Sequence, residues 1–334
     1  MTTTLLVDGD NLFKIGFHGV RELYNESKHI GGLFHFINTL RKHILENEFD
    51  KVIVFWDGRN NSQKRKDIFP EYKQNRKQTL NEYQKESFDW QRQRVKLYLE
   101  ELFIRQSMID GCESDDLIAY YCHISEDEFK TIFSSDKDLT QLISEQVSVY
   151  SPIKRQLYKK GDKIDIDDLE IPHENIVVYK TIMGDKSDNI DGIHFLGVKT
   201  LVKLFPEILS EKIDINFVKE KTKELAKNIT STAVTNLLEG KTKRGIIGDF
   251  FWERNGKLVD LSVPLLSDEN KSEVNDYYCE DLDPEGRGYK NLIRLMIEDG
   301  IFKYLPKQDE QWVEFVNPFM KLTRKEKRRF IKNQ

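Results

Sequence analysis

Three short apolar runs in the first half of the chain have the pattern of buried parallel strands. They span residues 5–7, 52–56 and 131–133, and they are rich in β-branched and aromatic residues. Helical patterns lie between them, at residues 33–45, 84–102 and 114–122. This alternation predicts an α/β fold with a central, mostly parallel sheet that is flanked by helices.

The remaining segments are less regular. Residues 58–80 are polar, basic and aromatic, and the stretch is too long for an ordinary connection, so we expect it to be functional or mobile. From Glu174 onward the pattern is helical with glycine-rich turns. A strand-like piece follows at residues 257–261, and a charged C-terminal segment ends the chain.

Composition indicates a protein that works in a reducing, aqueous compartment. A third of the 334 residues are charged, and no apolar run approaches the roughly 20 residues that a membrane span needs. The three cysteines, Cys112, Cys122 and Cys279, are too few and too scattered for a disulfide framework or a metal knuckle. We therefore expect a cytoplasmic monomer with no membrane contact, whose cysteines are ordinary buried thiols.

Basic residues are concentrated although the net charge is -5. Residues 64–96 carry ten basic side chains against five acidic ones, a local charge of +5. The last fourteen residues, KLTRKEKRRFIKNQ, carry seven basic side chains and one acidic one, a local charge of +6. Nucleic-acid binding and a merely solvated helix face both explain such runs, and composition does not decide between them.

Acidic residues recur where the predicted strands and helices end. The candidates are Asp8, Asp57, Glu113 with Asp115 and Asp116, Asp136 with Asp138, and Asp185 with Asp188. Each alone is explained by capping of the next helix. Together they indicate a site, because the carboxyl ends of parallel strands form the functional edge of an open α/β sheet. Glu113 and Asp116 share a helix face by their spacing, and Asp136 and Asp138 point the same way if their turn is extended.

So many carboxylates in one place require cations. Two unit charges about 4 Å apart repel by about 4 kcal/mol at an effective dielectric constant near 20. All donors are oxygens and no histidine accompanies them, which favours Mg²⁺ or Mn²⁺ over zinc. Two such ions about 4 Å apart activate a water and stabilise the leaving oxygen of a phosphoryl transfer. We expect two Mg²⁺ ions, which Mn²⁺ can replace, and hydrolysis of a phosphodiester.

The order of these motifs resembles the 5′ nuclease superfamily of flap endonucleases and 5′-to-3′ exonucleases, most of all the bacteriophage ribonuclease H-type members. The resemblance covers residues 4–262. Asp8 and Asp57 match the aspartates after the family's first two strands, while Asp10 stands at a position that is often uncharged in relatives. The motifs E-x-D-D, S-x-D-x-D and M-G-D-x-x-D-N match GCESDD, SSDKD and MGDKSDN, which implies that the carboxylates named above are the metal ligands.

The resemblance also implies a role for the basic stretch. FPEYKQNR is similar to the start of the family's arch, which implies that Lys73 and Arg76 are catalytic cations over the scissile phosphate. We expect Arg65 and Lys66, in the same stretch, to bind nucleic acid. By this resemblance residues 1–183 are a metal-dependent nuclease core that includes the arch, at residues 58–105.

After MGDKSDN, the sequence IDGIHFLGVKT is similar to the family's helix-turn-helix element, expected at residues 184–262. Gly192, Gly197, Lys199 and Thr200 match its duplex-binding residues, and the resemblance implies a bound K⁺ ion there. Phe195 stands where relatives usually have glycine. Residues 263–334 are then a C-terminal extension, whose basic tail contacts duplex backbone, docks on a replication clamp or single-strand binding protein, or is a frayed solubilising end.

The resemblance implies a structure-specific 5′ nuclease that acts on DNA and RNA·DNA with 5′ ends, flaps or nicks and removes RNA primers and flaps. A haloacid dehalogenase-type phosphatase is the main alternative, because LLVDGDN imitates its nucleophile loop with Asp8 as nucleophile and Asp10 as acid and base. That alternative leaves Asp57 and GCESDD without a role. A PIN-type ribonuclease, usually shorter and without the glycine turns, and a catalytically inactive binder are the others.

Overall fold

A six-stranded sheet forms the centre of the computed structural model, which describes residues 2–20, 22–76, 79–279, 282, 285–305 and 311–333. The strand order is β5-β4-β1-β6-β7-β8, and all neighbours are parallel except β8, which is antiparallel to β7. The strands are β1 (Thr2–Asp8), β4 (Lys51–Phe55), β5 (Arg105–Ser107), β6 (Glu128–Phe133), β7 (Val147–Ser151) and β8 (Gln156–Tyr158). The predicted α/β class and its three strands are confirmed.

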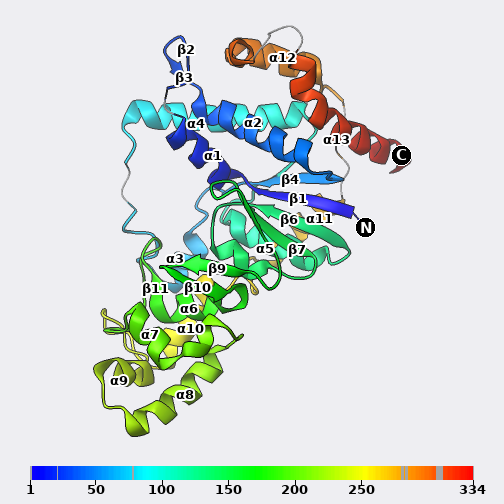
Figure 1. Ribbon diagram of the computed structural model, residues 1–334. Coiled ribbons are helices and arrows are strands. Elements are labelled where there is room, and N and C mark those ends of the chain that lie inside the picture. Colours follow the sequence, from blue (N-terminus) through cyan, green and yellow to red (C-terminus); the bar gives the residue numbers. More distant parts are fainter. Residues whose placement is uncertain are drawn as a thin grey trace.

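Helices cover both faces of this sheet (Figure 1). Helices α1 (Gly9–Gly19), α2 (Gly31–Glu46) and α4 (Glu82–Glu101) lie on one face, and α5 (Ser114–Ile124) and α6 (Ile176–Met183) lie on the other. Leu5 and Val7 of β1 pack into the first layer, whereas Leu6 packs into the second, because successive side chains of a strand point to opposite faces. Burial on both faces explains why β1 and β4 are continuous apolar runs without alternation.

A second, mostly helical region lies below the sheet in Figure 1. It contains α7 (Val198–Leu204), α8 (Ile215–Asn228), α9 (Thr232–Glu239) and α10 (Asp249–Val259), with the short hairpins β9 (Lys163–Ile166) with β10 (Leu169–Pro172) and β11 (Gly184–Asp185) with β12 (Ile190–Asp191). The strand predicted at residues 257–261 was wrong. Leu258 and Val259 end α10 and, with Phe251 and Trp252 seven residues earlier, form one buried helical face.

The basic segment after β4 joins these two regions. Its short helix α3 (Gln63–Ile68) contacts α10, where Arg65 Nε donates to the Leu258 carbonyl at 3.2 Å, and α4 begins at an Asn81–Gln84 capping box. Residues 77 and 78 of the segment lie outside the described residues. The C-terminal half of α4 packs on α2, so the predicted arch, at residues 58–105, ends within the core of the sheet region.

The remaining elements are short or C-terminal. They are β2 (Tyr24–Asn25), β3 (Lys28–His29), α11 (Asp268–Cys279), α12 (Tyr289–Glu298), α13 (Gln311–Asn333) and the 3₁₀ turns η1 (Asp138–Leu142), η2 (His173–Asn175), η3 (Pro206–Leu209) and η4 (Ile301–Tyr304). Cys112 and Cys122 are buried free thiols, as predicted, while the side chain of Cys279 lies outside the described residues. No helix in the described ranges is long and apolar enough to cross a bilayer.

Helix α13 packs against α2 through Val316, Phe319 and Leu322, all of them buried. Arg105 of β5 and Glu326 of α13 form a buried ion pair at 3.1 Å. Residues 311–328 are therefore not a frayed tail. The side chains of residues 329–334 lie outside the described residues. The C-terminal helix is part of the core that supports the sheet.

Replacement of Phe319 tests this packing. Phe319→Ala should lower the free energy of unfolding by about 3–5 kcal/mol, because a fully buried ring leaves a cavity behind. Urea unfolding followed by tryptophan fluorescence measures the change. Lys321→Ala, on the exposed side of the same helix, should change it by less than about 0.5 kcal/mol. Equal stability of both variants and the wild type would show that α13 is not docked.

Candidate functional site

The parallel strands bring the first two predicted aspartates to one edge of the sheet. Asp8 is the last residue of β1 and Asp57 follows β4, whose Phe55 is in register with Asp8. Asp8 caps α1 by accepting from the Asn11 backbone N–H at 3.1 Å, and it also accepts from Ser134 Oγ at 2.9 Å. The capping role and a role in a site are thus compatible for the same carboxylate.

Asp57 connects this edge to the start of α5. Its carboxylate accepts from the Ser114 backbone N–H at 3.0 Å. This contact places Glu113, the N-terminal cap residue of α5, and Asp115 beside the ends of β1 and β4. Burial acts to raise the pKa of Asp57, but the Ser114 N–H and the charges of Lys14 and Lys73 bring it below its usual value.

A polar cavity of about 70 Å³ collects residues from four of the predicted motifs. Its acidic lining residues are Glu113, Asp115, Asp136, Asp138 and Asp188. Its other polar lining residues include Tyr72, Lys73 and Arg76 of the basic segment and Lys180 of α6. Residues that are more than 100 positions apart in the sequence therefore meet in one place, at the carboxyl edge of the sheet.

Burial and mutual repulsion act on these carboxylates. Burial, followed by the charges of Asp136 and Asp8, raises the pKa of Asp115 well above its usual range. Burial and the charge of Asp57 raise the pKa of Asp8 to about 7. Burial likewise raises the pKa of Asp138 to about 7, although Lys180 opposes the shift. Within the described part of the chain, no group donates a hydrogen bond to the Asp115 carboxylate. Such a donor set fits a divalent cation.

Lysine and arginine side chains of the protein form ion pairs with several of the carboxylates. Lys180 lies between Asp138 and Asp185, with its Nζ 2.7 Å from Asp185 Oδ2. Lys73 Nζ is 2.8 Å from Glu113 Oε1, and Arg76 is paired with Asp188. As the described side chains stand, no three His, Cys, Asp or Glu residues meet closely enough to hold a metal ion. Glu113, Asp138, Asp185 and Asp188 are therefore each paired with a lysine or arginine, and the acids do not form a ready ligand shell.

Arg65 lines the cavity but is paired with Asp116, which does not line it. Asp116 is 2% exposed, accepts from both terminal nitrogens of Arg65 at 2.5 and 3.1 Å, and accepts from the Leu265 backbone N–H. The prediction that Arg65 binds nucleic acid needs correction, because Arg65 is 5% exposed and also lies 3.4 Å from Glu113. Asp116 does not line the cavity. Lys66, which follows Arg65 in the sequence, is exposed.

The SSDKD segment reaches the cavity by a different geometry from the one expected. The prediction of an extended turn was wrong, because Asp138 starts the 3₁₀ turn η1 and its backbone N–H donates to Asp136 Oδ1 at 2.9 Å. This tight turn still directs both side chains into the cavity. Asp136 and Asp138 therefore lie together as predicted, but not because alternate residues of an extended turn point the same way.

Asp10 has a structural role. Arg92 of α4 donates to its carboxylate at 2.7 and 2.9 Å, and the Asp57 backbone N–H donates to it at 2.8 Å. A carboxylate held by three donors is poorly suited to act as the acid and base that the phosphatase alternative requires.

Sequence reasoning missed Tyr72, Lys180 and Arg92. The Tyr72 hydroxyl lies 2.9 Å from Asp188 Oδ2 and 3.3 Å from Glu113 Oε2, and burial raises its pKa far above the usual value. Lys180 offered a signal, since it is the one charged residue in the otherwise apolar helix IVVYKTIM. A lone cation in a buried helix predicts a buried acidic partner.

The basic segment is attached to the MGDKSDN turn by its backbone. The Lys73 N–H donates to the Asp188 carbonyl at 2.9 Å, Asn75 Nδ2 donates to the Lys186 carbonyl, and Asn189 Nδ2 donates to the Glu71 carbonyl. Lys73 has a left-handed backbone, with φ of 57°. Lys73 is therefore fixed over the cavity by main-chain contacts as well as by its charge.

The residues expected to bind duplex are only partly at the surface. A Cβ on Gly192 would lie 2.2 Å from the Met183 carbonyl oxygen, so glycine is required there for packing against α6. Gly197 caps α7 and is exposed, Lys199 is exposed, and Thr200 is half-buried. Phe195 has φ of 62°, the backbone conformation that glycine adopts most readily.

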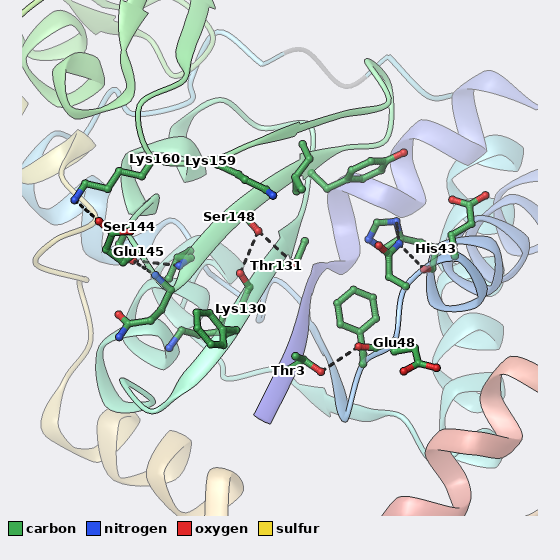
Figure 2. Close-up of a pocket in the computed structure, with 18 residues that line it drawn as sticks. Thr3, His43, Glu48, Lys130, Thr131, Ser144, Glu145, Ser148, Lys159 and Lys160 are labelled. Carbon is green, nitrogen blue, oxygen red and sulfur yellow. Dashed lines mark hydrogen bonds and ion pairs between the residues drawn. The ribbon is translucent and has the colours of Figure 1, made fainter. Parts of the chain in front are cut away.

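A larger hollow lies elsewhere in the described structure. It has a volume of about 810 Å³ and opens over β6, β7 and β8, with His43, Thr131 and Ser148 among its lining residues (Figure 2). None of the predicted site residues lines it. The chemistry of the side chains, and not the size of the hollow, therefore locates the candidate site.

Curated sequences provide the first comparison. The chain is 33% identical to DNA polymerase I of Bacillus caldotenax over 215 residues, which cover 60% of this chain and 23% of the polymerase. It is 30% identical to a 5′-3′ exonuclease of Buchnera aphidicola over 210 residues, which cover 61% of this chain and 71% of that protein. The chain thus spans about a quarter of the length of the polymerases that it matches.

Solved structures share the fold. A 5′-exonuclease of bacteriophage T5 with bound zinc has a TM-score of 0.65 and 22% identity, and the match covers 83% of this chain and 98% of that one. A T5 flap endonuclease with DNA and metal ions has the same TM-score and coverage at 23% identity. The family model for the 5′-3′ exonuclease N-terminal, resolvase-like domain matches residues 3–170, half of the chain. The chain belongs to this 5′-3′ exonuclease family.

Proposed function

We propose that this chain is a Mg²⁺-dependent, structure-specific 5′ nuclease, which cuts phosphodiesters near the 5′ ends of flaps, nicked duplexes and RNA·DNA hybrids. One observation supports this most: a single cavity at the sheet edge holds the acids of three motifs next to the cations of the basic segment. Family membership supports the same reaction class, and a T5 flap endonuclease of the same fold carries DNA and metal ions. Removal of RNA primers and flaps during replication or repair is the role that fits this activity.

The candidate metal ligands are the carboxylates at the cavity and next to it. They are Asp8, Asp57, Glu113, Asp115, Asp136, Asp138, Asp185 and Asp188. Bound divalent ions would supply an activated water and stabilise the charge on the leaving oxygen. The all-oxygen donor set favours Mg²⁺, and Mn²⁺ could replace it. Asp116 would act through Arg65, whose guanidinium fixes Glu113.

Lys73 and Arg76 would neutralise the scissile phosphate. Both lie over the acids in the absence of substrate, and a phosphate would compete with Glu113 and Asp188 for them. Tyr72 would orient Asp188 and Glu113, because its hydroxyl lies within hydrogen-bond reach of both carboxylates. Arg92 would position Asp57 indirectly, through Asp10 and the Asp57 backbone.

Each of the other parts of the chain would have a role of its own. Residues 1–183, with the arch at residues 58–105, would form the nuclease core, residues 184–262 the duplex-binding region and residues 263–334 a supporting extension. The left-handed backbone of Phe195 supports a K⁺ ion at the duplex-binding turn, because its carbonyls could keep the orientation of a glycine turn. The protein would be a cytoplasmic monomer and would bind a replication clamp or a single-strand binding protein.

A labelled flap substrate tests the reaction. Wild-type protein should release short 5′ products with Mg²⁺ and none with EDTA. Asp185→Asn should abolish cleavage but keep flap binding, since asparagine retains the oxygen that accepts from the Ser187 N–H and loses only the charge. Asp168→Asn, an exposed carboxylate away from the cavity, should cut like the wild type. Normal turnover by Asp185→Asn would remove the site assignment.

Thermal unfolding tests ion binding without any cleavage. In EDTA, Asp115→Asn should raise the melting temperature above that of the wild type, because a neutral amide replaces a carboxyl group whose anion is disfavoured by burial and by the acids around it. Addition of Mg²⁺ should stabilise the wild type, by about 2.7 kcal/mol at a hundred times Kd, and should stabilise the variant much less. A variant that is less stable in EDTA, with the full Mg²⁺ effect, would contradict the repulsive cluster.

A further inference from the structure

Phe195 combines a strained backbone with an exposed aromatic ring. Nine non-glycine residues in the described ranges have positive φ, and seven of them are polar or charged. The other aromatic one, Phe103, is 2% exposed and packs inside, whereas Phe195 is 69% exposed. A bulky residue in the left-handed region costs free energy, and burial of a mostly exposed ring offsets little of that cost. A residue in this position invites a functional explanation.

The surrounding chain forces this conformation. The backbone N–H of His194 donates to the Lys241 carbonyl at 2.9 Å, and the His194 carbonyl accepts from Asn236 Nδ2 at 2.7 Å. Ile193 and Leu196, on either side, are buried, and Ile193 forms a β-bridge with Thr242. The turn is therefore held from both sides and presents the Phe195 ring outward on a fixed support.

The chemistry around the ring indicates the kind of surface it meets. The His194 ring lies against it, with centroids 3.9 Å apart, and the two form an aromatic platform. Lys199, four residues further on, and Lys241, whose carbonyl holds the turn, both have exposed side chains. An aromatic platform on a turn that also carries exposed lysines matches a surface on which phosphates alternate with sugar carbons and base edges.

We propose that Phe195 is an apolar contact to the minor groove of the duplex part of the substrate. Its ring packs on sugars and base edges, while Lys199 and Lys241 contact the flanking phosphates. The inference rests on the proposed nuclease function and adds a residue that determines how tightly the duplex is held. The strain in the turn is then the stability lost in order to hold an aromatic ring at the surface.

Duplex binding by the full chain, measured by fluorescence anisotropy of a nicked duplex in EDTA, tests this role. Phe195→Gly should weaken binding roughly tenfold, as loss of an aromatic contact with nucleic acid does. Its melting temperature should not fall, because glycine accepts the left-handed backbone. Phe195→Tyr, which keeps the ring, should bind within roughly twofold of the wild type. Asp168→Gly, at an exposed residue with φ of 63°, is the matched control and should bind normally.

The salt dependence separates this contact from a phosphate contact. Phe195→Gly should leave the slope of log K against log salt unchanged, whereas Lys199→Ala should reduce it by about 0.9, one phosphate contact. Wild-type affinity in Phe195→Gly, or equal weakening in Asp168→Gly, would overturn the proposal while leaving the nuclease function intact. Failure of the wild type itself to bind any duplex would instead overturn both.

Discussion

Electrostatic repulsion among buried carboxylates is the constraint on which the rest of this structure depends. The parallel sheet gathers acids at one edge, and burial there raises the pKa of Asp8, Asp115 and Asp138. A fold can keep such a group only if cations balance it. Lys180, Lys73 and Arg76 do so in the structure, and each comes from an element outside the sheet. The need to balance the acids therefore links the sheet to α6 and to the basic segment.

The same contacts join the two halves of the molecule. The basic segment donates backbone and side-chain hydrogen bonds to the MGDKSDN turn, and Arg65 connects α3 to both α5 and α10. The cations of the basic segment and the candidate metal ligands thus form one continuous unit. A change of charge in the cavity, by an ion or by a phosphate, would act on the basic segment and on the helical region together.

Sequence patterns predicted the parts that follow from periodicity and from strand ends. Strands β1, β4 and β6 and the edge position of Asp8 and Asp57 were predicted, because continuous apolar runs and parallel connections leave few alternatives. The burial of Arg65 was not predictable, since a basic run gives no sign of which member meets an acid in space. The segment at residues 257–261 was misread because a short apolar run suits a strand and a helix end equally well. Lone charges in apolar helices, such as Lys180, carry information that a search for acidic motifs overlooks.

The most direct test of the central claim is the number and spacing of divalent ions that the apoprotein binds. Titration with Mn²⁺, followed by calorimetry and electron paramagnetic resonance, measures both quantities without a substrate. If the acids form one site, two ions bind per chain and show the magnetic coupling of centres about 4 Å apart. Binding of isolated, uncoupled ions, or none, would contradict the account.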